Sequence, residues 1–122
     1  MTRRHLRTLV ILAAVALGAC SSGSSGSQTT KTATGGAITV GAYDIRFDVK
    51  EIKATPGPLT VTLVNHGAVD HTFEIQRTSL LLKTNPGASA TGTVTLAAGT
   101  YTFDCTIPGH AAAGMKGTIV VA

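Results

Sequence analysis

Residues 99–115 read GTYTFDCTIPGHAAAGM, and this stretch decides how the rest of the chain is interpreted. In its first half, Tyr101, Phe103 and Cys105 alternate with polar residues, so the three side chains share one face of a predicted β-strand. The aromatic rings mark this face as the one turned to the core. Cys105 therefore points inward at the end of a strand, just before a Pro-Gly turn.

The same alternation occurs in residues 71–76, which read HTFEIQ. It places His71, Phe73 and Ile75 on the inward face and the polar residues on the other. A buried polar group without a partner is costly, so an inward imidazole beside an inward thiol needs something to bind.

Period-two alternation also marks residues 59–63 (LTVTL) and 93–96 (TVTL), and turn residues separate such segments throughout residues 37–122. Helical periodicity is absent. Seven or eight short strands in this length predict an all-β fold, a β-sandwich. Residues 80–84 fit either a helical turn or a loop.

The length of 122 residues allows one domain. The formal charge of +4 depends on Arg3, Arg4 and Arg7, without which seven Lys/Arg face six Asp/Glu and the net charge is near +1. No concentrated basic patch remains, which argues against nucleic-acid binding. With Cys20 and Cys105 as its two cysteines, the chain is not a disulfide scaffold.

Residues 1–19 are predicted to be a signal peptide, because a basic start precedes nine apolar residues, 9–17. A membrane-spanning helix needs roughly 20. The following Leu17-Gly18-Ala19-Cys20 resembles a bacterial lipobox, which implies lipidation of Cys20. The alternative is an ordinary signal peptide with a nearby cysteine. We expect an exported protein, lipid-anchored at the periplasmic or extracytoplasmic face of a bacterial cell envelope; the export route, Sec or Tat, and the choice of inner or outer membrane stay open.

Residues 20–36 are predicted to be the lipidated cysteine and a flexible linker. Positions 21–36 read SSGSSGSQTTKTATGG, a composition that cannot bury apolar surface. Sixteen residues of flexible chain have a root-mean-square end-to-end distance of about 20–24 Å. The folded domain is then expected to span residues 37–122.

One loop offers three candidate metal ligands: Cys105, His110 and Met115, each separated from the next by four residues. His71 can add a second imidazole from a neighbouring strand. Two histidines, one cysteine and a weak methionine are the ligand set of a blue-copper centre. Zinc could use the first three, although structural zinc sites normally close with Cys, His or carboxylate. A nucleophilic Cys–His pair is a further alternative, but no oxyanion hole or third orienting group is evident.

The motif in residues 99–117 resembles the C-terminal motif of the cupredoxins, small type 1 blue-copper proteins of the plastocyanin, azurin and auracyanin kind. Residues 65–71 match the family's first-histidine region, Asn-x-Gly-x-x-x-His. The resemblance implies an eight-stranded Greek-key sandwich with one copper ion at one end. It also implies that His71, Cys105 and His110 are the three equatorial ligands. Met115 is then the weak axial ligand.

The resemblance also suggests which residues surround the ligands. Many members carry Asn after the first histidine, where it braces the ligand loops; here that position is Thr72, and Thr106 follows the cysteine. Two hydroxyls could bond in place of the amide. Asn65 is a further supporting residue, and His66 is expected at the surface.

These features predict an electron carrier, monomeric and not an enzyme, that exchanges single electrons with a cytochrome, oxidase or reductase in the envelope. By resemblance, electrons pass through the exposed edge of His110. Its small apolar neighbours form a predicted docking patch: Ile107, Pro108, Ala111, Ala112 and Ala113. The alternatives are a copper-binding module for storage, delivery or tolerance, and a non-metal interaction domain. The sequence decides neither the potential nor the partner.

Overall fold

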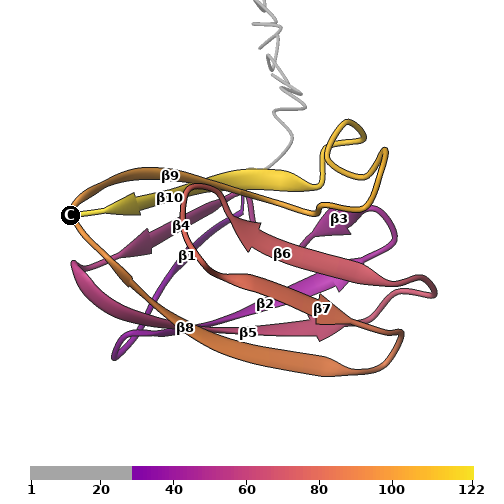
Figure 1. The fold of residues 1–122 in the computed structure, drawn as a ribbon, viewed down its shortest axis with the longest axis horizontal. Coiled ribbons are helices and arrows are strands. Elements are labelled where there is room, and N and C mark those ends of the chain that lie inside the picture. The colour runs from indigo at the N-terminus through magenta and orange to yellow at the C-terminus, as the bar shows by residue number, and fades with distance from the viewer. Residues whose placement is uncertain (1–28) are drawn as a thin grey trace, which may run out of the picture.

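The structure is a computed structural model that describes residues 29–122 (Figure 1). The predicted signal peptide, the lipidation site Cys20 and the first part of the linker lie outside these residues. The strands in chain order are β1 (Thr30–Thr32), β2 (Ala37–Tyr43), β3 (Arg46–Phe47), β4 (Glu51–Ala54), β5 (Gly57–Asn65), β6 (His71–Ile75), β7 (Leu81–Thr84), β8 (Ser89–Leu96), β9 (Gly99–Asp104) and β10 (Lys116–Val121).

The strands form two sheets, one ordered β1-β4-β10-β9-β6-β7 and the other β3-β2-β5-β8. The apolar faces of the sheets meet in one core, so the predicted all-β sandwich is confirmed. Residues 29–122 contain ten strands instead of the predicted seven or eight, because the short β1 and β3 carry too few residues to show alternation. Within residues 29–122 no helix is long and apolar enough to cross a membrane.

The linker was predicted to extend to residue 36, but Thr30–Thr32 form β1, which pairs in parallel with β4. Main-chain pairing needs no buried apolar side chain, so a polar composition does not prevent it. Lys31 strengthens the attachment: its ammonium donates to Asp48 Oδ2 at 2.6 Å and to the Thr39 carbonyl at 3.0 Å. Regular structure therefore begins before Ala37.

Residues 80–84, which fitted a helical turn or a loop, contain β7, an edge strand antiparallel to β6. Leu82 and Thr84 are buried, whereas Leu81 and Lys83 are exposed. Thr84 pairs with His71, so the backbone of β7 flanks the first residue of β6.

Three phenylalanines form the centre of the core. Phe73 and Phe103 stack with ring centroids 4.9 Å apart, and Phe47 meets both edge-on at 5.5 and 5.6 Å. Phe73 lies two residues after His71 and Phe103 two residues before Cys105, on the same strand faces. A tightly packed aromatic cluster therefore supports both candidate ligands from below.

Gly117 makes room for this cluster. A Cβ added there would overlap with the Lys50 carbonyl oxygen and the Phe103 ring. The first is backbone and the second is enclosed by other rings, so neither can move aside easily.

We expect Gly117→Ala to destabilise the domain by about 1–3 kcal/mol, the usual cost of overpacking. The midpoint of urea unfolding measures this change. Lys116→Ala, an exposed neighbour on the same strand, is the control and should stay within about 0.5 kcal/mol. Equal midpoints for the two variants would contradict the packing role of Gly117.

Candidate metal centre

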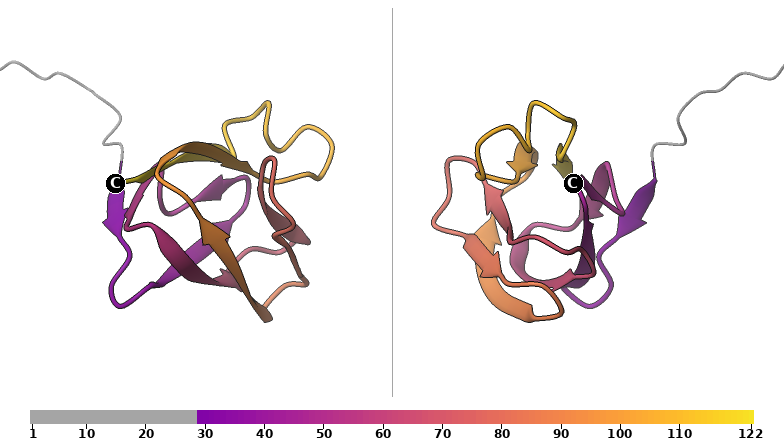
Figure 2. Two further views of the ribbon diagram at one scale, coloured as in Figure 1. Left: turned by 60° about the vertical axis from the view of Figure 1, so that its left-hand side comes forward. Right: turned by 90° about the vertical axis from the view of Figure 1, so that its right-hand side faces the viewer.

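The candidate ligands gather at one end of the sandwich. His71 begins β6, Cys105 directly follows β9, and the loop from residue 105 to residue 115 leads to β10. This loop projects beyond the two sheets (Figure 2). Because β6 and β9 are antiparallel neighbours, with Ile75 opposite Phe103, the start of one strand lies beside the end of the other.

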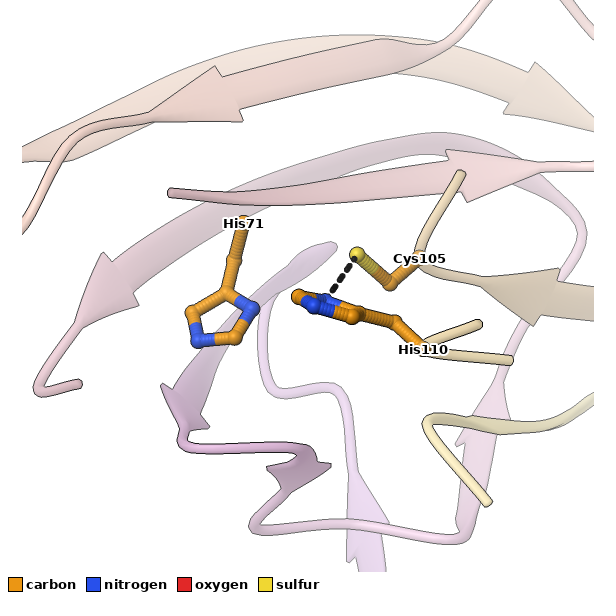
Figure 3. A group of neighbouring side chains, drawn as sticks. All are labelled: His71, Cys105 and His110. Carbon is orange, nitrogen blue, oxygen red and sulfur yellow. Dashed lines mark hydrogen bonds between the residues drawn. The ribbon is translucent and has the colours of Figure 1, made fainter. Parts of the chain in front are cut away.

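Three predicted ligands converge in space (Figure 3). The possible ligand atoms of His71, Cys105 and His110 all lie within 4.8 Å of one another. Cys105 Sγ is 3.5 Å from His110 Nδ1, and the two imidazole centroids are 5.2 Å apart. His71 and Cys105 are buried, with 0% and 1% of their surface exposed, whereas His110 is half-buried.

The two ring nitrogens of His71 have different environments. Nε2 is 3.3 Å from Asp44 Oδ1, but Nδ1 is buried and has no hydrogen-bond partner among residues 29–122. The ring is oriented with one nitrogen toward Cys105 and His110 (Figure 3). A buried nitrogen without a partner costs free energy. A metal ion bound between the three side chains would supply the missing partner, so the residues fit a metal site.

The sulfur of Cys105 receives two hydrogen bonds from Thr72. The Thr72 N–H donates at 3.4 Å and its hydroxyl at 3.6 Å. These two donors fix the position of the sulfur, and the thiolate is the form of cysteine that binds metals.

Thr72 and Thr106 form the hydroxyl pair expected from the sequence. The two Oγ1 atoms lie 2.8 Å apart, and the Thr106 N–H donates to Thr72 Oγ1 at 2.7 Å. If the Thr106 hydroxyl also donates, both lone pairs of Thr72 are used, and its proton is left for the sulfur. The pair thus links the segment after Cys105 to the residue after His71.

Asn65 supports the loop that precedes His71. Its side chain is buried; Nδ2 donates to the carbonyls of Val69 and Thr84 at 2.8 and 3.3 Å, and Oδ1 accepts from the Gly67 N–H at 2.8 Å. It therefore fixes the path of residues 66–70. His66 is exposed, as expected, and stacks on Tyr43 with centroids 5.0 Å apart.

Met115 closes the ligand loop through its backbone. Its carbonyl accepts from the Cys105 N–H, and its N–H donates to the His110 carbonyl, both at 3.0 Å. Its side chain is fully buried. The role of its thioether as an axial ligand stays a prediction. Lys50 holds the same end of the loop, since its ammonium donates to the carbonyls of Gly114 and Lys116.

Asp44 is a residue of the site that the sequence analysis missed. It lies in the turn between β2 and β3, and its two oxygens accept from the Ala68 N–H, each at 3.0 Å. The Ala68 N–H lowers the pKa of Asp44; desolvation opposes this, and the hydrogen bond to His71 lowers the pKa further. Asp44 is therefore a carboxylate in contact with a candidate ligand, and no spacing motif links it to His71.

Comparisons with known proteins agree with this architecture. A family described as a cupredoxin-like domain matches residues 9–121. Among solved structures, the dithionite-reduced auracyanin from the photosynthetic bacterium Roseiflexus castenholzii is 28% identical, with a TM-score of 0.65 over 74% of this chain and 98% of that one. No curated protein matches the chain.

Two more auracyanins share the fold. Auracyanin B is 24% identical, with a TM-score of 0.63 over 70% of this chain and 88% of that one. Auracyanin A, a "blue" copper protein from the green thermophilic bacterium Chloroflexus aurantiacus, is 23% identical, with a TM-score of 0.60 over 70% of this chain and 98% of that one.

Proposed function

This chain belongs to the family of cupredoxin-like domains, and we propose that it is a one-electron carrier that holds one type 1 copper ion. The observation that carries the proposal is the convergence of His71, Cys105 and His110, in which a buried nitrogen of His71 has no hydrogen-bond partner in the described part of the chain. Met115 is the proposed weak axial ligand. When bound, copper supplies a one-electron couple between Cu(I) and Cu(II).

The protein's part in this function is to hold the ligands still. His71 begins β6, Cys105 directly follows the neighbouring β9, and three packed phenylalanines lie next to both segments. Thr72 and Thr106 tie the two ligand segments together. Ligands that cannot rearrange suit a site that gains and loses an electron, because little motion accompanies the change in charge.

A module for copper storage, delivery or tolerance is the second candidate. The complete burial of His71 and Cys105 favours retention of the ion over its rapid transfer. With four protein ligands, no position would be left for a substrate, so we propose a carrier and not an enzyme.

Adding Cu(II) to the purified metal-free protein is expected to produce an intense blue colour from thiolate-to-copper charge transfer. Cys105→Ser should abolish the colour because it removes the thiolate, whereas Met115→Leu should keep it and shift the reduction potential. Visible absorption and voltammetry measure both effects. A colourless wild-type protein, or an intensely blue serine variant, would reject the assignment.

We propose that electrons enter and leave at His110, the half-exposed ligand. Its surroundings form the predicted docking patch, in which Pro108, Ala112 and Ala113 are exposed and Ile107 and Ala111 are half-buried. Small apolar side chains permit close approach by a redox partner such as a cytochrome, oxidase or reductase. Such encounters usually bury less than about 1,200 Å² and are brief, which suits a monomeric carrier.

Electron self-exchange between reduced and oxidised copies tests this surface without an identified partner. Ala112→Glu puts like charges into the encounter and should slow self-exchange by about tenfold, as measured by NMR line broadening. Ala98→Glu, in the turn before β9 at the opposite end of the sandwich, should change the rate by less than about twofold. Equal slowing by both variants would count against the patch.

We also propose that the carrier is tethered to the bacterial cell envelope through a lipid on Cys20. Support comes from the lipobox-like Leu17-Gly18-Ala19-Cys20 and the short apolar segment before it. Two or three acyl chains give durable membrane attachment.

Cys20→Ala is expected to remove the lipid and move the protein from the membrane fraction to the soluble envelope fraction. Fractionation and mass spectrometry of the mature chain measure the two effects. Ser21→Ala is the matched control and should stay with the membrane. An unmodified Cys20 in the wild-type protein would refute the anchor.

A further inference from the structure

We propose that Asp44 is a positioning residue of the metal centre. Its carboxylate accepts a hydrogen bond from the Nε2–H of His71, which leaves the lone pair of Nδ1 free to bind the metal. The inference rests on the proposed copper site for its functional meaning. The hydrogen bond itself is a property of the metal-free protein and is open to a separate test.

Asp44 is held in place from two directions. Oδ1 lies 3.3 Å from His71 Nε2, and both oxygens accept from the Ala68 N–H at 3.0 Å. The side chain is 47% exposed, yet these contacts fix its carboxylate between the histidine and the loop before it. The turn between β2 and β3 is thereby connected to the start of β6.

The proton inventory of His71 favours one tautomer. A neutral imidazole carries one N–H donor and one lone-pair acceptor. A proton on Nδ1 would bury a donor that has no acceptor within residues 29–122 and would turn the lone pair of Nε2 toward a carboxylate oxygen. A proton on Nε2 pairs with Asp44 and leaves the lone pair of Nδ1 on the side of Cys105 and His110. Asp44 therefore selects the form that can bind a metal.

Gly67 provides an independent sign that the pair is built into the fold. A Cβ added at Gly67 would overlap with Asp44 Oδ1 and would lie 3.0 Å from His71 Nε2. The backbone at Gly67 thus packs directly against the hydrogen bond between Asp44 and His71. A side chain at this position would push the carboxylate and the imidazole apart. Asn65 holds Gly67 there by accepting its N–H.

Asp44 could have the lesser role of fixing the loop through Ala68 alone. The two roles differ in their effect on a metal bound to His71. A carboxylate that accepts a hydrogen bond from Nε2–H makes the imidazole a stronger electron donor. It therefore favours the more highly charged state of a bound ion. Loss of the charge should then raise the reduction potential, which fixing of the loop alone would not explain.

The first test uses the metal-free protein with nitrogen-15 labelled histidine. NMR should show His71 protonated on Nε2, with an exchange-protected proton. Asp44→Ala should accelerate the exchange of this proton by about tenfold or more, in line with the loss of one net hydrogen bond to a charged group. A wild-type His71 protonated on Nδ1, or unchanged exchange in Asp44→Ala, would overturn the inference.

The second test uses the copper-loaded protein and a matched pair of variants. Asp44→Asn removes the charge and keeps the shape, whereas Asp70→Asn removes the same charge from an exposed residue next to His71 in the chain. Asp44→Asn should raise the potential more than Asp70→Asn does. Asp44→Ala should weaken metal affinity by about 10- to 100-fold, the usual effect of losing a partner behind a ligand.

Gly67→Ala keeps the Asp44 carboxylate but moves it away from the His71 ring, so this variant should raise the potential as Asp44→Asn does. Equal potentials for Asp44→Asn and Asp70→Asn would overturn the positioning role, because any nearby charge would then act alike. A protein that passes the NMR test but takes up no copper would reject the proposed function, while the hold of Asp44 on the His71 tautomer would stand.

Discussion

The antiparallel pairing of β6 with β9 is the constraint on which the rest of the structure depends. It sets Ile75 opposite Phe103 and thereby places His71 and Cys105 at the same end, on the same face, although they lie far apart in the sequence. A slip of one residue would turn one of the two to the opposite face of the sheet. The stacked rings of Phe73 and Phe103 oppose such a slip, because the same shift would turn one of the two rings out of the core.

Each of the three gathered side chains has its own means of orientation. His71 has a carboxylate behind it, Cys105 accepts two hydrogen bonds from Thr72, and His110 lies in a loop closed by the backbone of Met115. The contacts come from the turn after β2, from β6 and from the loop before β10. Segments that are remote in sequence therefore hold the three side chains in place, and no single segment fixes the site alone.

Alternation in the sequence predicted the strand faces of residues 59–63, 71–76 and 101–105, because burial on one face of a sheet imposes a period of two. It misjudged Thr72, which lies on the polar face and is nevertheless buried, since its hydroxyl is paired with Thr106. Asp44 was missed because its contact with His71 depends on how a turn folds over a loop. β1 was missed because main-chain pairing places few demands on side chains.

The direction of β1 matters for a protein proposed to be anchored through Cys20. β1, β4 and β10 are parallel, and β10 starts where the ligand loop ends, so Thr30 also lies at that end of the sandwich. The Lys50 N–H donates to the Thr29 carbonyl, while the Lys50 ammonium holds the loop at Gly114. An anchored chain would thus enter the domain beside the candidate metal centre, and its nine residues 21–29 span at most about 30 Å. A connection of this length would keep the end of the sandwich that carries His71, Cys105 and His110 within reach of proteins embedded in the same bilayer.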